Sequence, residues 1–330
     1  MQDFKSFSDD LTNLSSEAFD SMALDLFRFQ SKENEVYKSY LKARKVNPES
    51  VKTIQQIPFL PIQFFKEFKV ISGPEENFSK FFSSSGTTGM ITSKHFFDSE
   101  KRYLNHSLDL FQKEYGEIDN FHVLALLPAY LERKGSSLVS MANHWIQKSG
   151  SVHSGFYLYN QKELIQKIES LGSDKKNILL LGVTFALLDL AESGLPLNPP
   201  KNLIVMETGG MKGRRKEMIR EEVHDILKPF FQVNEVHSEY GMTELLSQAY
   251  SKGKGKYKIP SCMRVILRDL NDPLAESSTD RGAINIIDLA NVQSCAFIET
   301  QDLGRRDADG MIEILGRIDN SEIRGCNLLV

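Results

Sequence analysis

Residues 177–193 read NILLLGVTFALLDLAES, and this stretch decides the fold class. Its apolar first part predicts a buried strand over 177–183, and the part that follows predicts a helix over 184–193. The same order recurs, with strands expected at 122–127, 202–206 and 232–236 and helices at 136–147 and 214–227. Short apolar runs that alternate with helices are typical of a parallel sheet covered on both faces. The sequence therefore predicts an α/β protein.

Two segments of different texture flank this core. Before it, apolar residues recur at helical spacing over 11–46 and predict a helical pair, and the prolines of the 57–62 connector exclude a helix interior there. After Ser251, short alternating runs broken by glycine and proline predict a small β-rich part, with strands at 263–267, 283–289, 295–299 and 311–314. We expect a helical N-terminal segment over 1–56, an α/β core over 57–250 and a β-rich subdomain over 251–330.

Composition excludes several classes of protein. The 40 basic and 44 acidic residues give a formal charge of -4, so a nucleic-acid partner is not expected. The polar N-terminus lacks the apolar region of a signal peptide, and no window has the roughly 18 consecutive apolar residues of a spanning helix. We expect a cytoplasmic protein whose three cysteines, Cys262, Cys295 and Cys326, are free thiols without metal-binding spacing.

The first motif that carries chemistry is SSSGTTG at residues 83–89, with Lys94 five residues after it. Small residues let backbone N–H groups converge on an anion, and hydroxyl groups and a lysine add donors and positive charge. The motif predicts a phosphate-binding loop, but not the P-loop of NTPases, because the lysine does not follow the last glycine directly. A flexible Ser/Gly linker is the alternative.

The second motif is EYGMTE at residues 239–244, which follows the expected strand at 232–236. Residues at the carboxyl end of a parallel strand line the crevice where ligands bind. There the Thr243 hydroxyl can meet a phosphate and the Glu244 carboxylate can hold Mg²⁺. The alternative is that Thr243 and Glu244 only open a helix, because an acidic residue in the first turn suits the helix dipole.

The third motif is ETQDLGR at 299–305, followed by DADG at 307–310 and GRID at 316–319. The Asp302 carboxylate can accept both hydroxyls of a ribose. The DADG segment is typical of a hairpin turn, because the remaining ligands of a calcium loop are missing. No histidine shows the spacing of a zinc site.

Taken in this order, the three motifs resemble those of the adenylate-forming superfamily of acyl-CoA ligases, peptide-synthetase adenylation domains and firefly luciferase, over most of the chain from Phe81 to Cys326. The resemblance implies that fold, with ATP and Mg²⁺ as cofactors. Asp302 would hold the ribose, and Arg317 matches the arginine that follows this aspartate in the family. Tyr240 would stack on or flank the adenine. Thr243 would contact the α-phosphate and Glu244 would hold the metal. The other ATP-binding residues implied are Ser84, Ser85, Gly86, Thr87, Thr88, Gly89, Lys94, Gly209, Gly210, Glu239, Gly241 and Met242.

The mobile lid domain of the large members is expected to be absent, since the sequence stops soon after Asp319 at the hinge. The lid's catalytic lysine then has no counterpart, and Lys94 or Arg317 could replace it. A shorter subfamily, the acyl-protein synthetase of the bacterial bioluminescence fatty acid reductase complex, ends in a similar way. It is also similar at residues 127–138 and at 324–328, RGCNL, where Cys326 would accept the acyl group.

The resemblance implies an ATP-dependent ligase that activates a carboxylic acid as acyl-AMP with release of pyrophosphate and then transfers the acyl group to Cys326 and on to a partner. A fatty acid is the expected substrate. An acyl reductase subunit, an acyl carrier or coenzyme A could be that partner. Two alternatives stay open: an acyl-CoA or phenylacetate-type CoA ligase, and a non-catalytic nucleotide-binding regulatory module. His237, two residues before the second motif, is a candidate for the substrate pocket, and the sequence leaves the acid itself open.

Overall fold

A parallel sheet forms where the apolar runs predict it. The computed structural model describes residues 11–84, 91–127, 135–157, 160–211, 215–216, 218–272 and 274–318. Four parallel strands make the centre of the sheet: β4 (Phe121–Leu126), β6 (Asn177–Val183), β7 (Leu203–Thr208) and β8 (His237–Tyr240). Parallel β5 (Gly155–Tyr157) and antiparallel β9 (Ala249–Ser251) extend its two edges.

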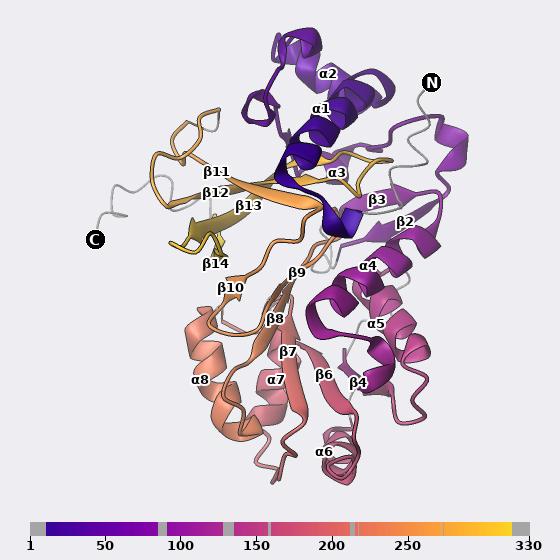
Figure 1. Cartoon of the computed structure of the whole chain (residues 1–330), viewed down its shortest axis with the longest axis vertical. Helices are drawn as coiled ribbons and strands as arrows, with labels where there is room; N and C mark the ends of the chain where they lie inside the picture. Colours follow the sequence, from indigo (N-terminus) through magenta and orange to yellow (C-terminus); the bar gives the residue numbers. More distant parts are fainter. Residues whose placement is uncertain are drawn as a thin grey trace.

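Helices cover both faces of this sheet, as the buried side chains of its strands require. Figure 1 shows α4 (Glu100–Tyr115) and α5 (Ser137–Lys148) on one side, and α7 (Thr184–Ala191) and α8 (Arg220–Phe231) on the other. Helix α6 (Gln161–Ser170) lies at the bottom of the view. The predicted α/β class is confirmed.

Two expected boundaries are wrong. The strand expected at 232–236 is β8 instead, at His237–Tyr240, because Gln232 takes a left-handed φ of 49° that ends α8. Helix α8 begins at Arg220, six residues after the expected start at 214. Residues 218–219 and 233–236, which carry part of the apolar pattern, belong to loops.

A second sheet is built mainly from the C-terminal part of the chain. Its strands follow the order β10 (Lys256–Tyr257), β14 (Ile312–Arg317), β13 (Phe297–Arg306), β12 (Arg281–Asp288) and β11 (Met263–Arg268). A short strand from the 57–62 connector, β1 (Leu60–Pro61), pairs parallel with β13. Strands β11 to β14 lie where the sequence predicts them, although β13 continues well beyond its apolar start, and β10 is a strand that the sequence does not predict.

The N-terminal helices pack on this second sheet. Helices α1 (Ser16–Glu33) and α2 (Glu35–Ala43) form the predicted helical pair. Phe27 of α1 packs edge-on against Phe297 of β13, with ring centroids 5.9 Å apart. The buried Gln30 amide donates to Asn291 O at 2.8 Å and accepts from Ala296 N at 2.9 Å. Helix α1 and the second sheet therefore share one core. The expected division of the chain at residues 56 and 250 stays a prediction.

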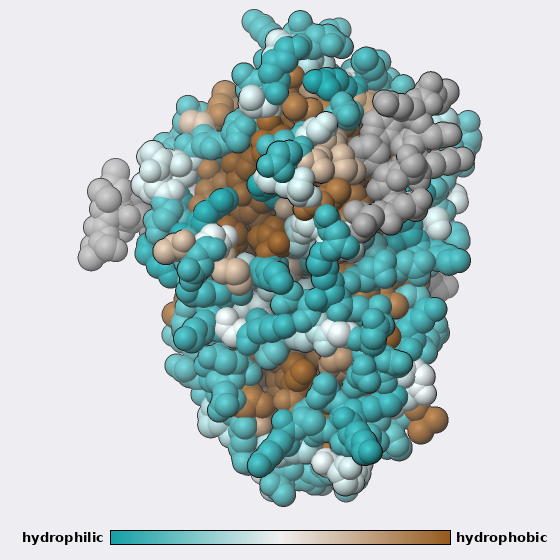
Figure 2. Space-filling view, viewed as in Figure 1, coloured by the Kyte–Doolittle hydropathy of each residue, from teal (hydrophilic) through white to brown (hydrophobic). Residues whose placement is uncertain are grey.

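A two-stranded hairpin and a short helix complete the fold. The hairpin consists of β2 (Lys80–Ser83) and β3 (Lys94–Phe97), and helix α3 (Phe64–Glu67) follows β1. Short 3₁₀ turns lie at Leu11–Asn13, Pro48–Ser50, Ile54–Gln56, Glu75–Asn77 and Ile118–Asn120. Polar side chains cover most of the face in Figure 2, with hydrophobic ones mainly in its upper half. Among the helices described, none is long and apolar enough to cross a membrane.

Candidate active site

The second motif lies at the carboxyl end of β8, which points toward the second sheet (Figure 1). Tyr240 is the last residue of the strand and is 8% exposed. A Cβ at Gly241 would lie 2.4 Å from Glu239 Oε1, so a glycine is needed there for the carboxylate to keep its place. The Thr208 hydroxyl at the end of β7 donates to that same carboxylate. The chain therefore leaves the two neighbouring strands in a fixed conformation.

Tyr240 joins the second motif to the third. Its hydroxyl donates to Asp302 Oδ2 of β13 at 2.7 Å. Asp302 pairs with Arg317 across β13 and β14, and Arg317 Nε lies 3.7 Å from Asp302 Oδ1. Burial raises the pKa of Asp302, while the Tyr240 hydrogen bond and the Arg317 charge oppose that rise. Three predicted ATP-binding residues thus meet, because Tyr240 and the exposed Arg317 both contact the Asp302 carboxylate.

Glu244 is a buried carboxylate at the end of the second motif. Its side chain is nearly enclosed, at 5% exposed. Burial raises its pKa, and a hydrogen bond with the Ser93 side chain works in the opposite direction. Asn291 Nδ2 donates to Glu244 O at 2.8 Å and holds the backbone. Sequence reasoning missed Ser93 and Asn291, whose roles depend on long-range contacts.

Thr243 is held by His95 of β3. The Nδ1 of this buried ring lies 2.7 Å from Thr243 O. Burial lowers the pKa of His95 to about 4, so the ring is neutral near pH 7, and a carbonyl partner requires the proton on Nδ1. This contact fixes the backbone at Thr243, the residue whose hydroxyl is expected to meet a phosphate.

Asp288 fixes the turn that follows Glu244. This fully buried carboxylate accepts hydrogen bonds from Leu246 N at 2.9 Å and from Ser247 N at 3.0 Å and Oγ at 2.6 Å. A buried carboxylate is retained where donors surround it. Sequence reasoning missed Asp288 too; the signal was an acidic residue directly after the apolar pair Ile286 and Ile287 of a strand.

The first motif begins on the hairpin, where Ser84 and Ser93 bond to each other just beyond the paired residues of β2 and β3. Ser84 N donates to Ser93 O at 3.1 Å, and Ser93 N donates to Ser84 Oγ at 2.9 Å. Lys94 faces Ser83 across the hairpin, and its Nζ lies 5.2 Å from the centroid of the Phe81 ring. Five predicted phosphate-binding residues lie outside the described part of the chain: Ser85, Gly86, Thr87, Thr88 and Gly89.

Contacts bring the three motifs together. Ser93 bonds to Ser84 of the hairpin, and its side chain is among the groups that lower the pKa of Glu244. The Tyr240 hydroxyl of the second motif donates to Asp302 of the third. The glycine pair lies after the next strand of the sheet: Gly209 follows β7 with a left-handed φ of 71°, and a Cβ at Gly210 would meet nothing within 4 Å. The described site residues thus gather at one edge of the parallel sheet, where the second sheet faces it.

His237 lies apart from this group. It is the first residue of β8, three residues before Tyr240, and its Nδ1 lies 3.1 Å from the Tyr115 hydroxyl. Burial lowers the pKa of His237 to about 4. Its place in the substrate pocket stays a prediction.

The two described thiols are both unreactive. Cys262 and Cys295 are fully buried, and burial raises the pKa of each to about 12, so they are poor nucleophiles near pH 7. Cys326, like Asp319, lies outside the described residues.

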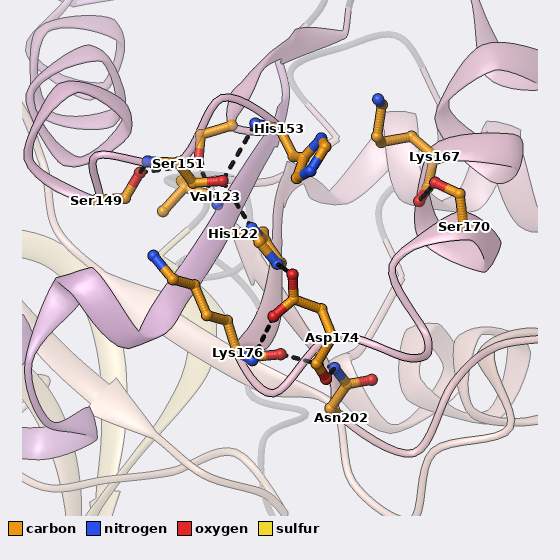
Figure 3. A network of polar contacts seen from close by, with 11 residues as sticks. His122, Val123, Ser149, Ser151, His153, Lys167, Ser170, Asp174, Lys176 and Asn202 are labelled. Atoms are coloured by element: carbon orange, nitrogen blue, oxygen red, sulfur yellow. Dashed lines mark hydrogen bonds and ion pairs between the residues drawn. The ribbon is translucent and has the colours of Figure 1, made fainter.

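A separate polar network lies at the amino ends of β4 and β6, away from the gathered motifs (Figure 3). His122 is buried, with Nδ1 2.7 Å from Ser151 Oγ and Nε2 3.3 Å from Asp174 Oδ2. Ser151 Oγ also accepts from His153 N at 3.1 Å, and Asp174 accepts from Lys176 N at 3.0 Å. These backbone contacts give the network a structural role in fixing two loops.

The described side chains fit a nucleotide with Mg²⁺. Asp302 offers a carboxylate for hydroxyl groups, and Glu244 offers the hard oxygen ligand that Mg²⁺ prefers. In the described part of the chain no three His, Cys, Asp or Glu side chains cluster as a complete metal site. One carboxylate is sufficient where phosphates supply further ligands, because Mg²⁺ at such sites keeps few protein contacts.

Sequence comparison points to acyl-protein synthetases. Residues 6–103 match the family model described as acyl-protein synthetase, LuxE. The chain is 22% identical over 336 residues to a long-chain-fatty-acid–luciferin-component ligase of Aliivibrio fischeri. The match covers 94% of this chain and 86% of that protein. A protein of the same name from Photorhabdus luminescens is 33% identical over 69 residues, 21% of this chain and 59% of that protein.

Structure comparison identifies the fold. A 2-hydroxyisobutyryl-CoA ligase in the postadenylation state superposes with a TM-score of 0.68 at 11% identity, over 94% of this chain and 73% of that chain. An ATP-bound RpMatB-BxBclM chimera superposes with a TM-score of 0.54 at 19% identity, over 76% of this chain, which spans half the length of the chimera. The predicted resemblance is confirmed: the chain has the fold of the adenylate-forming ligases and is similar to the acyl-protein synthetases, which supports the predicted enzyme class, an acid ligase.

Proposed function

We propose that this protein is an ATP-dependent acyl-protein synthetase that acts in the cytoplasm. A carboxylate oxygen attacks the α-phosphorus of ATP, the bond to the β-phosphate oxygen breaks, and pyrophosphate leaves with the electron pair. The observation that carries the proposal is the hydrogen bond that the Tyr240 hydroxyl of the second motif donates to Asp302 of the third motif at 2.7 Å. It joins the motif that bears the metal-ligand candidate to the motif that bears the ribose-ligand candidate.

Each described residue has a role in this reaction. Asp302 accepts the ribose hydroxyls, and the Tyr240 hydroxyl orients its carboxylate. The Thr243 hydroxyl faces the α-phosphate, held by the contact of its backbone with His95. Glu244 would hold Mg²⁺, which when bound neutralises phosphate charge. Catalysis rests on positioning and on fixed charges, as is usual for reactions of phosphate groups.

The second half of the reaction uses Cys326. Its thiolate attacks the carbonyl carbon of the acyl-adenylate, a thioester forms, and AMP leaves. Arg324, two residues away in the sequence, favours the charged sulfur. The high pKa of Cys262 and Cys295 supports this assignment, because neither offers a competing thiolate.

The substrate class follows from the relatives. Two are named long-chain-fatty-acid ligases, so we propose a fatty acid as the substrate and a protein, such as an acyl reductase subunit, as the final acceptor. A 2-hydroxyisobutyryl-CoA ligase shares the fold, which keeps coenzyme A as the second candidate acceptor.

Exchange of labelled pyrophosphate into ATP tests the first half of the reaction. We expect exchange that requires both a fatty acid and Mg²⁺, because acyl-adenylate formation is reversible on the enzyme. ATP binding without exchange for any acid, aliphatic or aryl, would instead identify a non-catalytic nucleotide-binding module. Exchange followed by free acyl-CoA, with no acylated protein, would identify the CoA ligase.

A further inference from the structure

One arginine, Arg220, contacts both sheets of the molecule. It is the first residue of α8, which lies below β10 and β14 in Figure 1. Its Nε donates to Glu207 Oε1 of β7 at 3.1 Å, and its Nη1 donates to Ile314 O of β14, also at 3.1 Å. The guanidinium group has several N–H donors in a fixed planar geometry, so it can hold both acceptors at once. Arg220 therefore links the end of β7 in the parallel sheet to β14 in the second sheet.

The Glu207 end of this link is held in place. The Glu207 side chain is 4% exposed, and its Oε2 accepts a hydrogen bond from the Thr184 hydroxyl, at the start of α7, at 2.8 Å. A buried carboxylate is retained where a cation and hydroxyl donors surround it. Gly209, the first residue of the glycine pair, follows two residues after Glu207. The link thus begins next to residues that are expected to bind ATP.

The Ile314 end of the link lies beside the ribose-ligand candidate. Arg317, three residues further along β14, is paired with Asp302 of β13, and its Nε lies 3.7 Å from Asp302 Oδ1. A hydrogen bond that fixes Ile314 O therefore fixes the strand that runs next to the Asp302 carboxylate.

A second set of contacts joins Arg220 to the same carboxylate. The guanidinium carbon lies 5.1 Å from the centroid of the Tyr257 ring, which belongs to β10 and is fully buried. That ring packs against the Tyr240 ring, with centroids 5.8 Å apart, and the Tyr240 hydroxyl donates to Asp302. Arg220 thus supports Asp302 both through β14 and through Tyr240.

We propose that Arg220 is a positioning residue for ATP, which holds the Asp302 carboxylate at the distance from the glycine pair at which one nucleotide contacts both. This inference rests on the proposed function and adds a residue to its nucleotide site. In this role Arg220 contacts protein groups and no reacting atom. Because Asp302 and the glycine pair belong to different sheets, a small shift between the sheets separates two groups that must bind one ligand. The arginine therefore acts on the affinity for ATP rather than on the bond that breaks.

The double variant Glu207→Gln/Arg220→Met tests the inference. Arg220→Met alone would leave the Glu207 carboxylate buried and unpaired, whereas the double variant removes both charges and is expected to keep the melting temperature of the wild type. Arg215→Met is the matched control. Arg215 lies five residues earlier and pairs with Asp189 of α7 and, at 2.8 Å, with Glu192 directly after that helix, so its loss leaves the link between the sheets intact.

Calorimetric titration with ATP and with AMP is the first measurement. We expect both dissociation constants to rise about 10- to 30-fold in the double variant and to stay within about twofold of the wild type in Arg215→Met. Glu207→Gln alone is expected to lose less affinity than the double variant, because its amide oxygen can still accept from Arg220 Nε.

The kinetics of acid-dependent pyrophosphate release separate positioning from a general loss of structure. In the double variant we expect the KM for ATP to rise by the same factor as the dissociation constant, while kcat stays within about threefold and the KM for the acid is unchanged. An unchanged affinity for ATP in the double variant would overturn the inference, and so would a fall in kcat together with the melting temperature. Absence of ATP binding by the wild type would instead contradict the proposed function itself.

Discussion

Replacement of Glu244 by Gln is expected to reduce Mg²⁺-dependent pyrophosphate release about 100-fold, on the order of 2.7 kcal/mol of transition-state stabilisation. The amide keeps the shape of the side chain but loses the charge that binds the metal. The Ser93 side chain and the Asn291 contact to Glu244 O remain available, so the fold is expected to persist. A titration of the rate with Mg²⁺ is the measurement.

The pH dependence of Mg²⁺ binding provides a second test of Glu244. Because burial raises the pKa of this carboxylate, protons compete with Mg²⁺ at a higher pH than for an ordinary glutamate. The Mg²⁺ affinity of the wild type is expected to fall as the pH decreases through that raised pKa, and the Gln variant is expected to lack this dependence.

Glu235→Gln is the matched control. This glutamate lies just before β8 and pairs with Lys228, at 3.2 Å. The same chemical change there is expected to leave the Mg²⁺ titration as in the wild type. Undiminished pyrophosphate release by Glu244→Gln would remove Glu244 from the metal site.

Replacement of Asp302 by Ala is expected to weaken ATP binding about 30- to 100-fold, because hydrogen bonds from two ribose hydroxyls to a carboxylate are lost. The substitution also leaves the Tyr240 hydroxyl without its acceptor at 2.7 Å. Calorimetric titration with ATP measures the affinity directly, and AMP is expected to lose a similar factor since it carries the same ribose.

Asp307→Ala controls for the loss of one acidic side chain from the same hairpin. Asp307 pairs with Lys256 at 2.7 Å and belongs to the turn between β13 and β14. Its removal is expected to leave the ATP affinity unchanged. An unaltered affinity in Asp302→Ala would mean that the third motif does not hold the ribose.

The sequence predicts the parallel sheet well because buried parallel strands are almost wholly apolar. Strand β6 begins and ends as expected at Asn177–Val183. Strand β8 was misplaced because its residues, His237–Tyr240, are mostly polar and carry the site, whereas the apolar residues before it belong to a loop. Strand β8, which carries residues of the candidate site, thus has the weakest hydrophobic pattern in the parallel part of the sheet.

The site is predictable in its parts but not in its connections. The rule that ligands bind at the carboxyl ends of parallel strands places Thr243 and Glu244 near Gly209. It does not predict that β1 would pair with β13, or that His95 and Asp288 would hold the second motif. Those contacts join residues far apart in sequence, and no local pattern records them.

Intact-mass measurement tests the central claim most directly. The wild type and Cys326→Ser are each incubated with MgATP and a series of aliphatic and aryl acids. We predict an adduct of the mass of one acyl group, formed from a fatty acid on the wild type alone and cleaved by neutral hydroxylamine as a thioester. An adduct that persists in Cys326→Ser, or no adduct despite acid-dependent pyrophosphate release, would contradict acyl transfer to Cys326.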